Sequence, residues 1–160
     1  MRLIIALLFC IITTQGKAQM NDSTIIVGKV THALVSKYIW YDKQYQSYHP
    51  KDSIVQLLKI FAPQLRLKVV LGTWCSDSKE HVPALFKIAQ TTNIAIEAIE
   101  LIAVDKKKKC PTPDISQLHI EYVPTIFVYK NGIQMGSIIE APTLTLEEDL
   151  LTIITKKNDR

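Results

Sequence analysis

The sequence contains no hydrophobic run long enough to span a lipid bilayer. Its longest apolar run covers the ten residues 3–12, whereas a membrane-spanning helix takes about 20 residues. The run follows Arg2 and precedes a polar stretch in which Gly16 and Ala18 are small. This pattern is typical of a secretory signal peptide. We therefore predict that residues 1–18 are cleaved off and that the exported chain has no stable membrane span; a membrane anchor is the alternative.

Cysteine is scarce, and the spacing of the three cysteines argues against the common zinc sites. Cys10 lies in the predicted signal peptide, where a lipoprotein would use it, but the bulky Phe9 before it does not fit a lipoprotein signal. The exported chain keeps Cys75 and Cys110, which in an oxidising compartment either pair or stay free for chemistry. No Cys and His have the spacing of a zinc site. We expect neither a metal nor another cofactor.

A strong excess of charge is also missing. The full chain carries a formal net charge of +4, which falls to +2, 17 basic against 15 acidic residues, once Arg2 and Lys17 leave with the signal peptide. Such a mild excess does not support a nucleic-acid partner, and we expect none. The densest charge is the four-lysine run at residues 106–109. An anionic ligand or a membrane surface would explain the run, but a solvated basic loop is the commoner explanation.

Residues 19–64 are predicted to form an N-terminal extension that is largely helical. The β-branched residues at 24–30 allow a short strand. After the His-Pro pair, a helix with good apolar spacing is expected to run to about Phe61, capped by Asp52 or Ser53.

Between these elements, residues 31–48 have a helical pattern that is rich in tyrosine. On a helix, Tyr38, Tyr41, Tyr45 and Tyr48 would form one stripe. The stripe is either a binding surface or the face of an amphipathic helix that packs on the domain, and we favour the second interpretation.

From residue 65 onward, short apolar runs alternate with helical patterns. Strands are expected at residues 67–71, 96–104, 122–129 and 133–140, and helices at 76–91 and after Thr145. The first strand is almost wholly apolar, which is typical of a central strand buried on both faces. Asn131 and Gly132 predict a tight hairpin. Thr145 with Glu148 three residues later predicts a capping box.

The chemistry-bearing stretch is Gly-Thr-Trp-Cys-Ser-Asp-Ser at residues 72–78. Cys75 stands at a strand-to-helix junction, where unsatisfied N–H groups and the positive end of the helix dipole favour the thiolate. Trp74 would form a flat apolar wall beside it. Asp77 stabilises the helix start, but its negative charge opposes a nearby thiolate. A small buried hydrophobe is the plain alternative for a lone cysteine, and we favour a reactive thiol.

The order of these features resembles the thioredoxin-like superfamily over residues 65–157. The run Trp-Cys-Ser-Asp-Ser at 74–78 stands where thioredoxins carry Trp-Cys-Gly-Pro-Cys, and Val-Pro-Thr at 123–125 matches their active-site cis-proline segment. Pro83 falls at their helix-kinking proline. The run Gly-Thr-Trp-Cys-Ser-Asp-Ser followed by Val-Pro looks like a branch of exported bacterial thioredoxin-like proteins, here with a Trp-Cys-x-x-Ser motif.

The resemblance implies an α/β thioredoxin-like fold at residues 65–160, a central mixed β-sheet flanked by helices, with residues 19–64 packed on it. It makes Cys75 the nucleophile and puts Ser78 in the place of the resolving cysteine. It also implies the bacterial periplasm as location, and protein or peptide thiols and disulfides, or small-molecule thiols, as partners. The residues that it implies for substrate binding are Trp74, Ser76, Asp77, Val123 and Pro124, with Pro124 in the cis form.

The departures from the family pattern concern turnover. The buried acid of thioredoxins would stand at Val69 and its lysine partner at Leu101, and neither residue here is ionisable. Ser78 cannot resolve a mixed disulfide, because an alcohol does not displace a thiolate. Ser78 either donates a hydrogen bond to the thiolate or merely extends the helix. An external thiol or Cys110 remains to resolve the mixed disulfide, and an unpaired loop thiol is the interpretation of Cys110 that we favour over pairing with Cys75.

Two hypotheses follow. In the first, Cys75 is the nucleophile of a monothiol thioredoxin-like protein, an oxidoreductase or isomerase that performs thiol–disulfide exchange or releases mixed disulfides. In the second, the chain is a non-catalytic thioredoxin-fold module that binds peptide or protein partners through the same groove.

Overall fold

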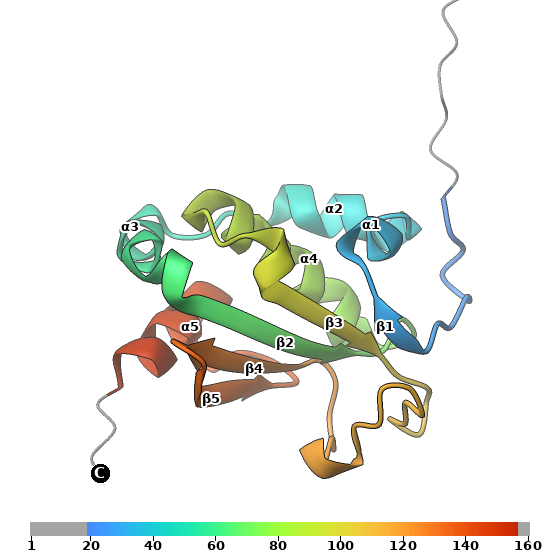
Figure 1. The fold of residues 1–160 in the computed structure, drawn as a ribbon. Helices are drawn as coiled ribbons and strands as arrows, with labels where there is room; N and C mark the ends of the chain where they lie inside the picture. Colours follow the sequence, from blue (N-terminus) through green and yellow to red (C-terminus); the bar gives the residue numbers. More distant parts are fainter. Residues whose placement is uncertain (1–18, 157–160) are drawn as a thin grey trace, which may run out of the picture.

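Within residues 19–156, which the computed structural model describes, a five-stranded mixed β-sheet organises the chain (Figure 1). The predicted signal peptide lies outside these described residues. The strand order is β1-β3-β2-β4-β5; β2 and β3 are parallel, and the other neighbours are antiparallel. The strands are β1 (Gly28–Val30), β2 (Leu65–Leu71), β3 (Ile99–Ala103), β4 (Thr125–Lys130) and β5 (Ile133–Ile139).

β2 lies at the centre of the sheet because its side chains are buried on both faces. Val69 and Leu71 point into the large core, and Val70 points to the opposite face. All three are completely buried, as the apolar run predicted. The hairpin between β4 and β5 is also as predicted, since Asn131 and Gly132 both adopt positive φ, 51° and 80°.

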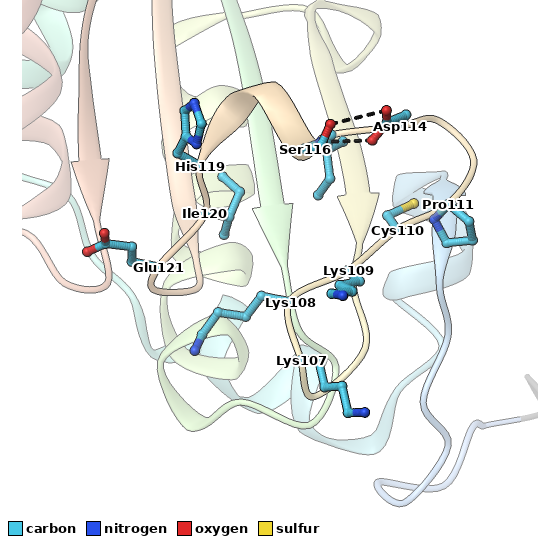
Figure 2. Close-up of a pocket in the computed structure, with 11 residues that line it drawn as sticks. Lys107, Lys108, Lys109, Cys110, Pro111, Asp114, Ser116, His119, Ile120 and Glu121 are labelled. Atoms are coloured by element: carbon cyan, nitrogen blue, oxygen red, sulfur yellow. Dashed lines mark hydrogen bonds between the residues drawn. The ribbon is translucent and has the colours of Figure 1, made fainter.

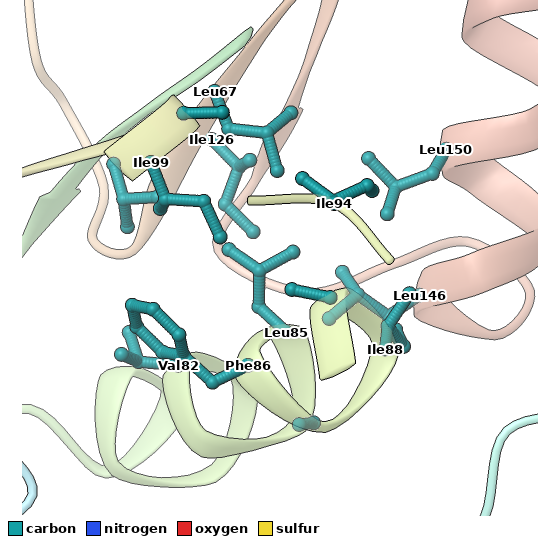
Figure 3. Packing of buried hydrophobic residues seen from close by; sticks show 14 of the residues in the cluster. Leu67, Val82, Leu85, Phe86, Ile88, Ile94, Ile99, Ile126, Leu146 and Leu150 are labelled. Carbon is teal, nitrogen blue, oxygen red and sulfur yellow. The ribbon is translucent and has the colours of Figure 1, made fainter. Parts of the chain in front are cut away.

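The α-helices of the described segment contribute to one large hydrophobic core on a single face of the sheet (Figure 1). Leu85 and Leu150 come from two of these helices and are completely buried. Figure 3 shows Leu85 near Ile126 and Leu67 of the sheet, and Leu150 near Ile94. The helices are α1 (His32–Val35), α2 (Ile39–Ser47), α3 (Asp52–Phe61), α4 (Ser76–Thr92) and α5 (Leu146–Thr155).

Part of the opposite face is covered by residues 105–122, which include only a short 3₁₀ turn at Ser116–Leu118. Figure 1 shows this segment on the side of the sheet away from α1 and α2. Beneath it lies a second, smaller cluster, which we call the loop-side cluster. Its buried members are Val70, Ile102, Val104, Cys110, Ile115 and Val123.

These features together are an α/β thioredoxin-like fold, as the resemblance implied. The Trp-Cys pair follows the central strand β2, α4 starts directly after it, and the proline segment leads into β4. The last helix, α5, begins with the predicted capping box: Thr145 Oγ1 accepts the Glu148 N–H, and the Glu148 carboxylate accepts the Thr145 N–H at 3.2 Å.

Three predicted strands begin later than expected, because a strand extends only where it has a partner. The strand predicted from residue 122 begins as β4 at Thr125, the first residue that pairs with β2 and β5. Residues Ile96–Ala98 form a 3₁₀ turn, and β3 begins at Ile99, the first residue that pairs with β2. Of residues 24–30, only Gly28–Val30 form a strand. Gly28 already pairs with Ala103, the last residue of β3, so the residues before it have no strand to join.

The helix predicted over residues 31–48 is divided into α1 and α2. Tyr38 between them is extended, with φ −69° and ψ 142°, and its hydroxyl donates a hydrogen bond to Thr24 O at 2.7 Å. This tertiary contact overrides the helical pattern. Tyr41 is buried, and Tyr45 and Tyr48 pack against the large core, which agrees with the packing interpretation of the stripe.

The predicted cap of the next helix is wrong. The N-cap of α3 is Lys51, which makes no side-chain capping bond, and Asp52 is already the first helical residue. The division into an extension at 19–64 and a domain at 65–160 stays a prediction. Over residues 19–156 the helices are too short or too polar for any of them to cross a bilayer.

Candidate active site

Cys75 is the N-cap residue of α4, with extended backbone angles of φ −87° and ψ 132°. Its side chain is half-buried. The thiol donates a hydrogen bond to Val123 O at 3.0 Å, and Asp77 Oδ2 lies 3.7 Å from the sulfur. The Val123–Pro124 peptide bond is cis. The fold thus brings Cys75, Asp77 and the Val123–Pro124 segment together, and their roles in catalysis and substrate binding stay predictions.

Trp74 forms a wall of the site, and contacts with backbone groups hold its indole ring in place. Its indole Nε1–H donates to Val104 O at 3.0 Å. The ring packs directly over Gly72, where an added Cβ would lie 2.7 Å from Trp74 Cε2. Glycine is therefore required at residue 72 by the close approach of the indole ring. The half-buried ring packs against the loop-side cluster together with Cys75.

Ser78 is completely buried, and its side chain binds the loop before Cys75. Its Oγ accepts the Gly72 N–H at 3.1 Å. Within residues 19–156, no hydrogen bond joins Ser78 to the Cys75 thiol. The hydroxyl therefore closes the turn between β2 and α4 in this structure. Ser76, by contrast, is exposed at the first position of α4.

Thr73 is a site residue that the sequence reasoning missed. It is completely buried, its hydroxyl donates to Thr24 O at 3.1 Å, and it accepts the Ile26 N–H at 3.4 Å. The loop that carries Trp74 and Cys75 is thereby tied to the N-terminal segment. No spacing rule reveals such a contact, because both partners on the N-terminal side are backbone groups.

The sheet beneath the site is apolar where thioredoxins carry an ionisable pair. Val69 and Leu101 are direct register partners on β2 and β3, and they are 0% and 1% exposed. No ionisable side chain is present at either position to take up a proton.

Cys110 lies in the loop-side cluster and is 4% exposed. Its thiol donates to Thr112 O at 3.3 Å. Cys75 packs against the same cluster, but both cysteines are free thiols. Cys110 is thus a free thiol buried in apolar surroundings in this structure, and its role as a resolving thiol stays a prediction. The structure gives it no disulfide with Cys75.

The electrostatic surroundings of the site are sparse. Lys79, one turn into α4, pairs with Asp22 of the N-terminal segment at 3.4 Å. In the part of the chain that the structure describes, no group of three or more His, Cys, Asp or Glu residues is placed to hold a metal ion. The chemistry that the site offers is that of one half-exposed thiol between a helix N-terminus and a backbone carbonyl.

No protein-family model matches this chain, and no curated protein does either. Among solved structures, an HIV epitope scaffold has a TM-score of 0.58 at 18% identity, over 81% of this chain and 93% of its own. PA1234, a protein of unknown function from Pseudomonas aeruginosa, has a TM-score of 0.51 at 20% identity, over 76% and 82%. These likenesses show the fold alone. Mitochondrial thioredoxin 3 from Saccharomyces cerevisiae also matches, at 24% identity over 60% and 86%, with a TM-score of 0.34.

Proposed function

We propose that this chain is an exported monothiol thioredoxin-like protein that exchanges thiols and disulfides through Cys75. The observation that carries the proposal is the position of Cys75 as the N-cap residue of the 17-residue helix α4, with its side chain only partly buried. A helix N-terminus stabilises negative charge, and the thiolate is the nucleophilic form of cysteine. Cys75 is partly buried rather than enclosed in the core, as a thiol that meets a substrate disulfide must be.

The proposed reaction is an exchange without net oxidation. The Cys75 thiolate attacks one sulfur of a substrate disulfide, forms a mixed disulfide and releases the other sulfur as a thiolate. An external thiolate then attacks the mixed disulfide, forms a new disulfide with the bound substrate half and frees Cys75. One disulfide and one thiolate enter, and one of each leaves. Ser78 takes no part, because its hydroxyl is buried and binds the Gly72 N–H.

The surrounding residues have separate roles in this proposal. Trp74 supplies an apolar wall, and the backbone of Val123 next to cis Pro124 orients an extended substrate chain through strand-like hydrogen bonds. The Cys75 proton leaves to water or to Asp77, 3.7 Å away, since Val69 and Leu101 have no ionisable group. The signal-peptide pattern at residues 1–18 supports export, and the resemblance supports the bacterial periplasm as location.

A non-catalytic module that binds peptide or protein partners through the surface around Cys75, Val123 and Pro124 is the second candidate. The thiol-to-carbonyl contact favours it, because the protonated form of Cys75 makes this hydrogen bond. The apolar floor at Val69 and Leu101 also favours it. In that function, Cys75 acts as a hydrogen-bond donor rather than as a nucleophile.

The rate of alkylation separates the two candidates. Two variants of residues 19–160 are treated with N-ethylmaleimide at pH 7. The alkylation rate of the Cys110→Ser variant is that of Cys75 alone, and the rate of the Cys75→Ser variant is that of Cys110 alone. We expect Cys75 of the folded protein to react about tenfold faster than the same cysteine in urea, because the helix N-terminus favours the thiolate. Buried Cys110 is expected to react more slowly when folded than in urea.

Turnover is measured with a fluorogenic mixed disulfide and an external thiol. We expect the Cys110→Ser protein to keep full activity and Cys75→Ser to lose it. If folded Cys75 reacts no faster than in urea and the mixed disulfide is not turned over, the exchange function is refuted and the binding module is supported.

A further inference from the structure

We infer that a cavity beside the lysine run binds a small amphipathic anion, an apolar body with one anionic end. The cavity has a volume of about 770 Å³ and is formed by residues from 107 to 121 (Figure 2). Sites for small molecules usually measure about 300–1,000 Å³ and combine apolar walls with a few polar groups. We call it the lysine-loop cavity; it is outside the residues that the proposed exchange reaction uses.

The inner side of the lysine-loop cavity is apolar. Cys110 and Ile115 line it and are 4% and 6% exposed, and half-buried Ile120 lines it as well. All three belong to or pack against the loop-side cluster. An alkyl chain or aromatic ring placed against them would be removed from water, with a favourable free energy of about 25 cal/mol per Å² of buried apolar surface.

The rim of the cavity is cationic. Lys107, Lys108 and Lys109 line it, and none of them makes an ion pair with a residue of the described segment. Asp105 and Asp114 are close in sequence, but their carboxylates serve local turns. Asp105 Oδ1 accepts the N–H groups of Lys107 and Lys109 at 2.9 and 2.8 Å.

Asp114 is engaged in the same way, since its carboxylate accepts the Ser116 N–H at 2.9 Å and the Ser116 hydroxyl at 3.1 Å. These hydrogen bonds hold the pKa of Asp114 below its usual value. Glu121 also lines the cavity, and Figure 2 shows its carboxylate turned away from the lysine loop. Exposed His119 also lines the cavity. Hydrogen bonds do not neutralise these carboxylates, so the lining carries three lysine charges against the charges of Asp114 and Glu121, a net excess of one positive charge. An apolar floor under this rim fits an amphipathic anion.

The test titrates octanoate into residues 19–160 carrying Cys75→Ser, with binding followed by calorimetry. Octanol and octylamine, which share the alkyl chain, are the comparison ligands. We expect saturable 1:1 binding of octanoate, about tenfold weaker binding of octanol and none of octylamine, because a cationic rim selects the charge of the head group. Protection of Cys110 from N-ethylmaleimide by octanoate places the ligand in the cavity. The Cys75→Ser background makes the outcome independent of the exchange chemistry.

A single charge reversal tests the rim. The variant Lys108→Glu is expected to bind octanoate about tenfold more weakly and octanol unchanged. Lys106→Glu is the matched control, because Lys106 belongs to the same run but does not line the cavity, and it should change binding less than about twofold. Equal weakening by Lys106→Glu, octanol binding as tight as octanoate, or no protection of Cys110 would each overturn the inference. Circular dichroism confirms that each variant is folded.

Discussion

The buried hydroxyl of Ser78 offers the sharpest test of how the site is built. The change is Ser78→Ala, which removes the acceptor of the Gly72 N–H, 3.1 Å away in the turn before Cys75. Ser78 is 0% exposed, and Gly72 is also buried, so water does not replace the lost partner without rearrangement of the turn.

The expected loss of stability follows from two opposing effects. A buried donor left without its acceptor costs about 1–3 kcal/mol. Alanine has a higher helix propensity than serine by about 0.5 kcal/mol, and residue 78 lies in α4. The net expectation is that the free energy of unfolding falls by about 0.5–2.5 kcal/mol.

The assay is urea unfolding followed by tryptophan fluorescence, with Ser76→Ala as the matched control. Ser76 lies two residues earlier in the same helix but is exposed, so its replacement should change stability by less than about 0.5 kcal/mol. The alkylation rate of Cys75 is measured on the same two variants. If Ser78→Ala is as stable as Ser76→Ala while Cys75 alkylation slows about tenfold, the hydroxyl serves the thiolate and our interpretation of the turn is wrong.

Two further predictions concern titratable groups, His32, which is partly buried, and Glu147, which is fully buried. Burial lowers the pKa of His32, so its contribution to the free energy of unfolding should be fully present above about pH 6.5, where an unfolded histidine titrates, and should be lost at lower pH. The variant His32→Gln should therefore show a weaker pH dependence of the urea unfolding midpoint. The control variant His49→Gln, at an exposed histidine, should keep the pH dependence of the unchanged protein. Burial alone would raise the pKa of Glu147, but hydrogen bonds from Tyr48 and Lys51 outweigh burial and lower it, so its stabilisation is lost as pH falls. Glu147→Gln should cost about 1.5–3 kcal/mol at pH 7 and less in acid, measured by the same unfolding assay, whereas a constant difference would contradict the charge-based reasoning.

The contacts behind these two predictions lie away from the site. His32 Nε2 is 2.7 Å from the Tyr41 hydroxyl, and the imidazole packs on Phe86 with ring centroids 4.1 Å apart. Glu147 is 1% exposed and accepts hydrogen bonds from the Tyr48 hydroxyl at 2.5 Å and from the Lys51 N–H at 3.0 Å. Exposed Glu97 provides the control substitution for Glu147.

The order of elements from β2 to α5 was predictable because each has a local signal. The apolar run of β2, the Asn131-Gly132 turn and the Thr145 capping box depend on residues close together in the sequence. Strand ends were less predictable, since β3 starts where its partner begins rather than where its own apolar pattern does. The break at Tyr38 likewise results from a hydroxyl contact with Thr24 O.

In the candidate site, the sequence indicated the positions of Cys75 and Val123 through motif spacing, and the fold brings their atoms into contact. It did not reveal Thr73, because a threonine that binds backbone groups 47 and 49 residues away leaves no local pattern. The sequence left two roles open for Ser78, a hydrogen bond to the Cys75 thiolate or extension of the helix. The role depends on which group lies within hydrogen-bonding distance of the buried hydroxyl, and this is the Gly72 N–H. The lysine run looked like an ordinary solvated loop, because the cavity beside it exists only once residues 114–121 fold back.

The cover of the loop-side cluster has a consequence for how the molecule opens. Helices protect the large core, whereas the loop-side cluster is shielded by residues 105–122 with a single short 3₁₀ turn, Ser116–Leu118. Segments with few backbone hydrogen bonds of their own open at a free energy well below that of global unfolding. We therefore expect local opening of this cover to expose Cys110 to solvent while the α-helices of residues 19–156 stay folded. Residues 105–122 thus shield the Cys110 thiol. How often this thiol meets an oxidant depends on how long the segment stays closed, and not on the stability of the whole fold.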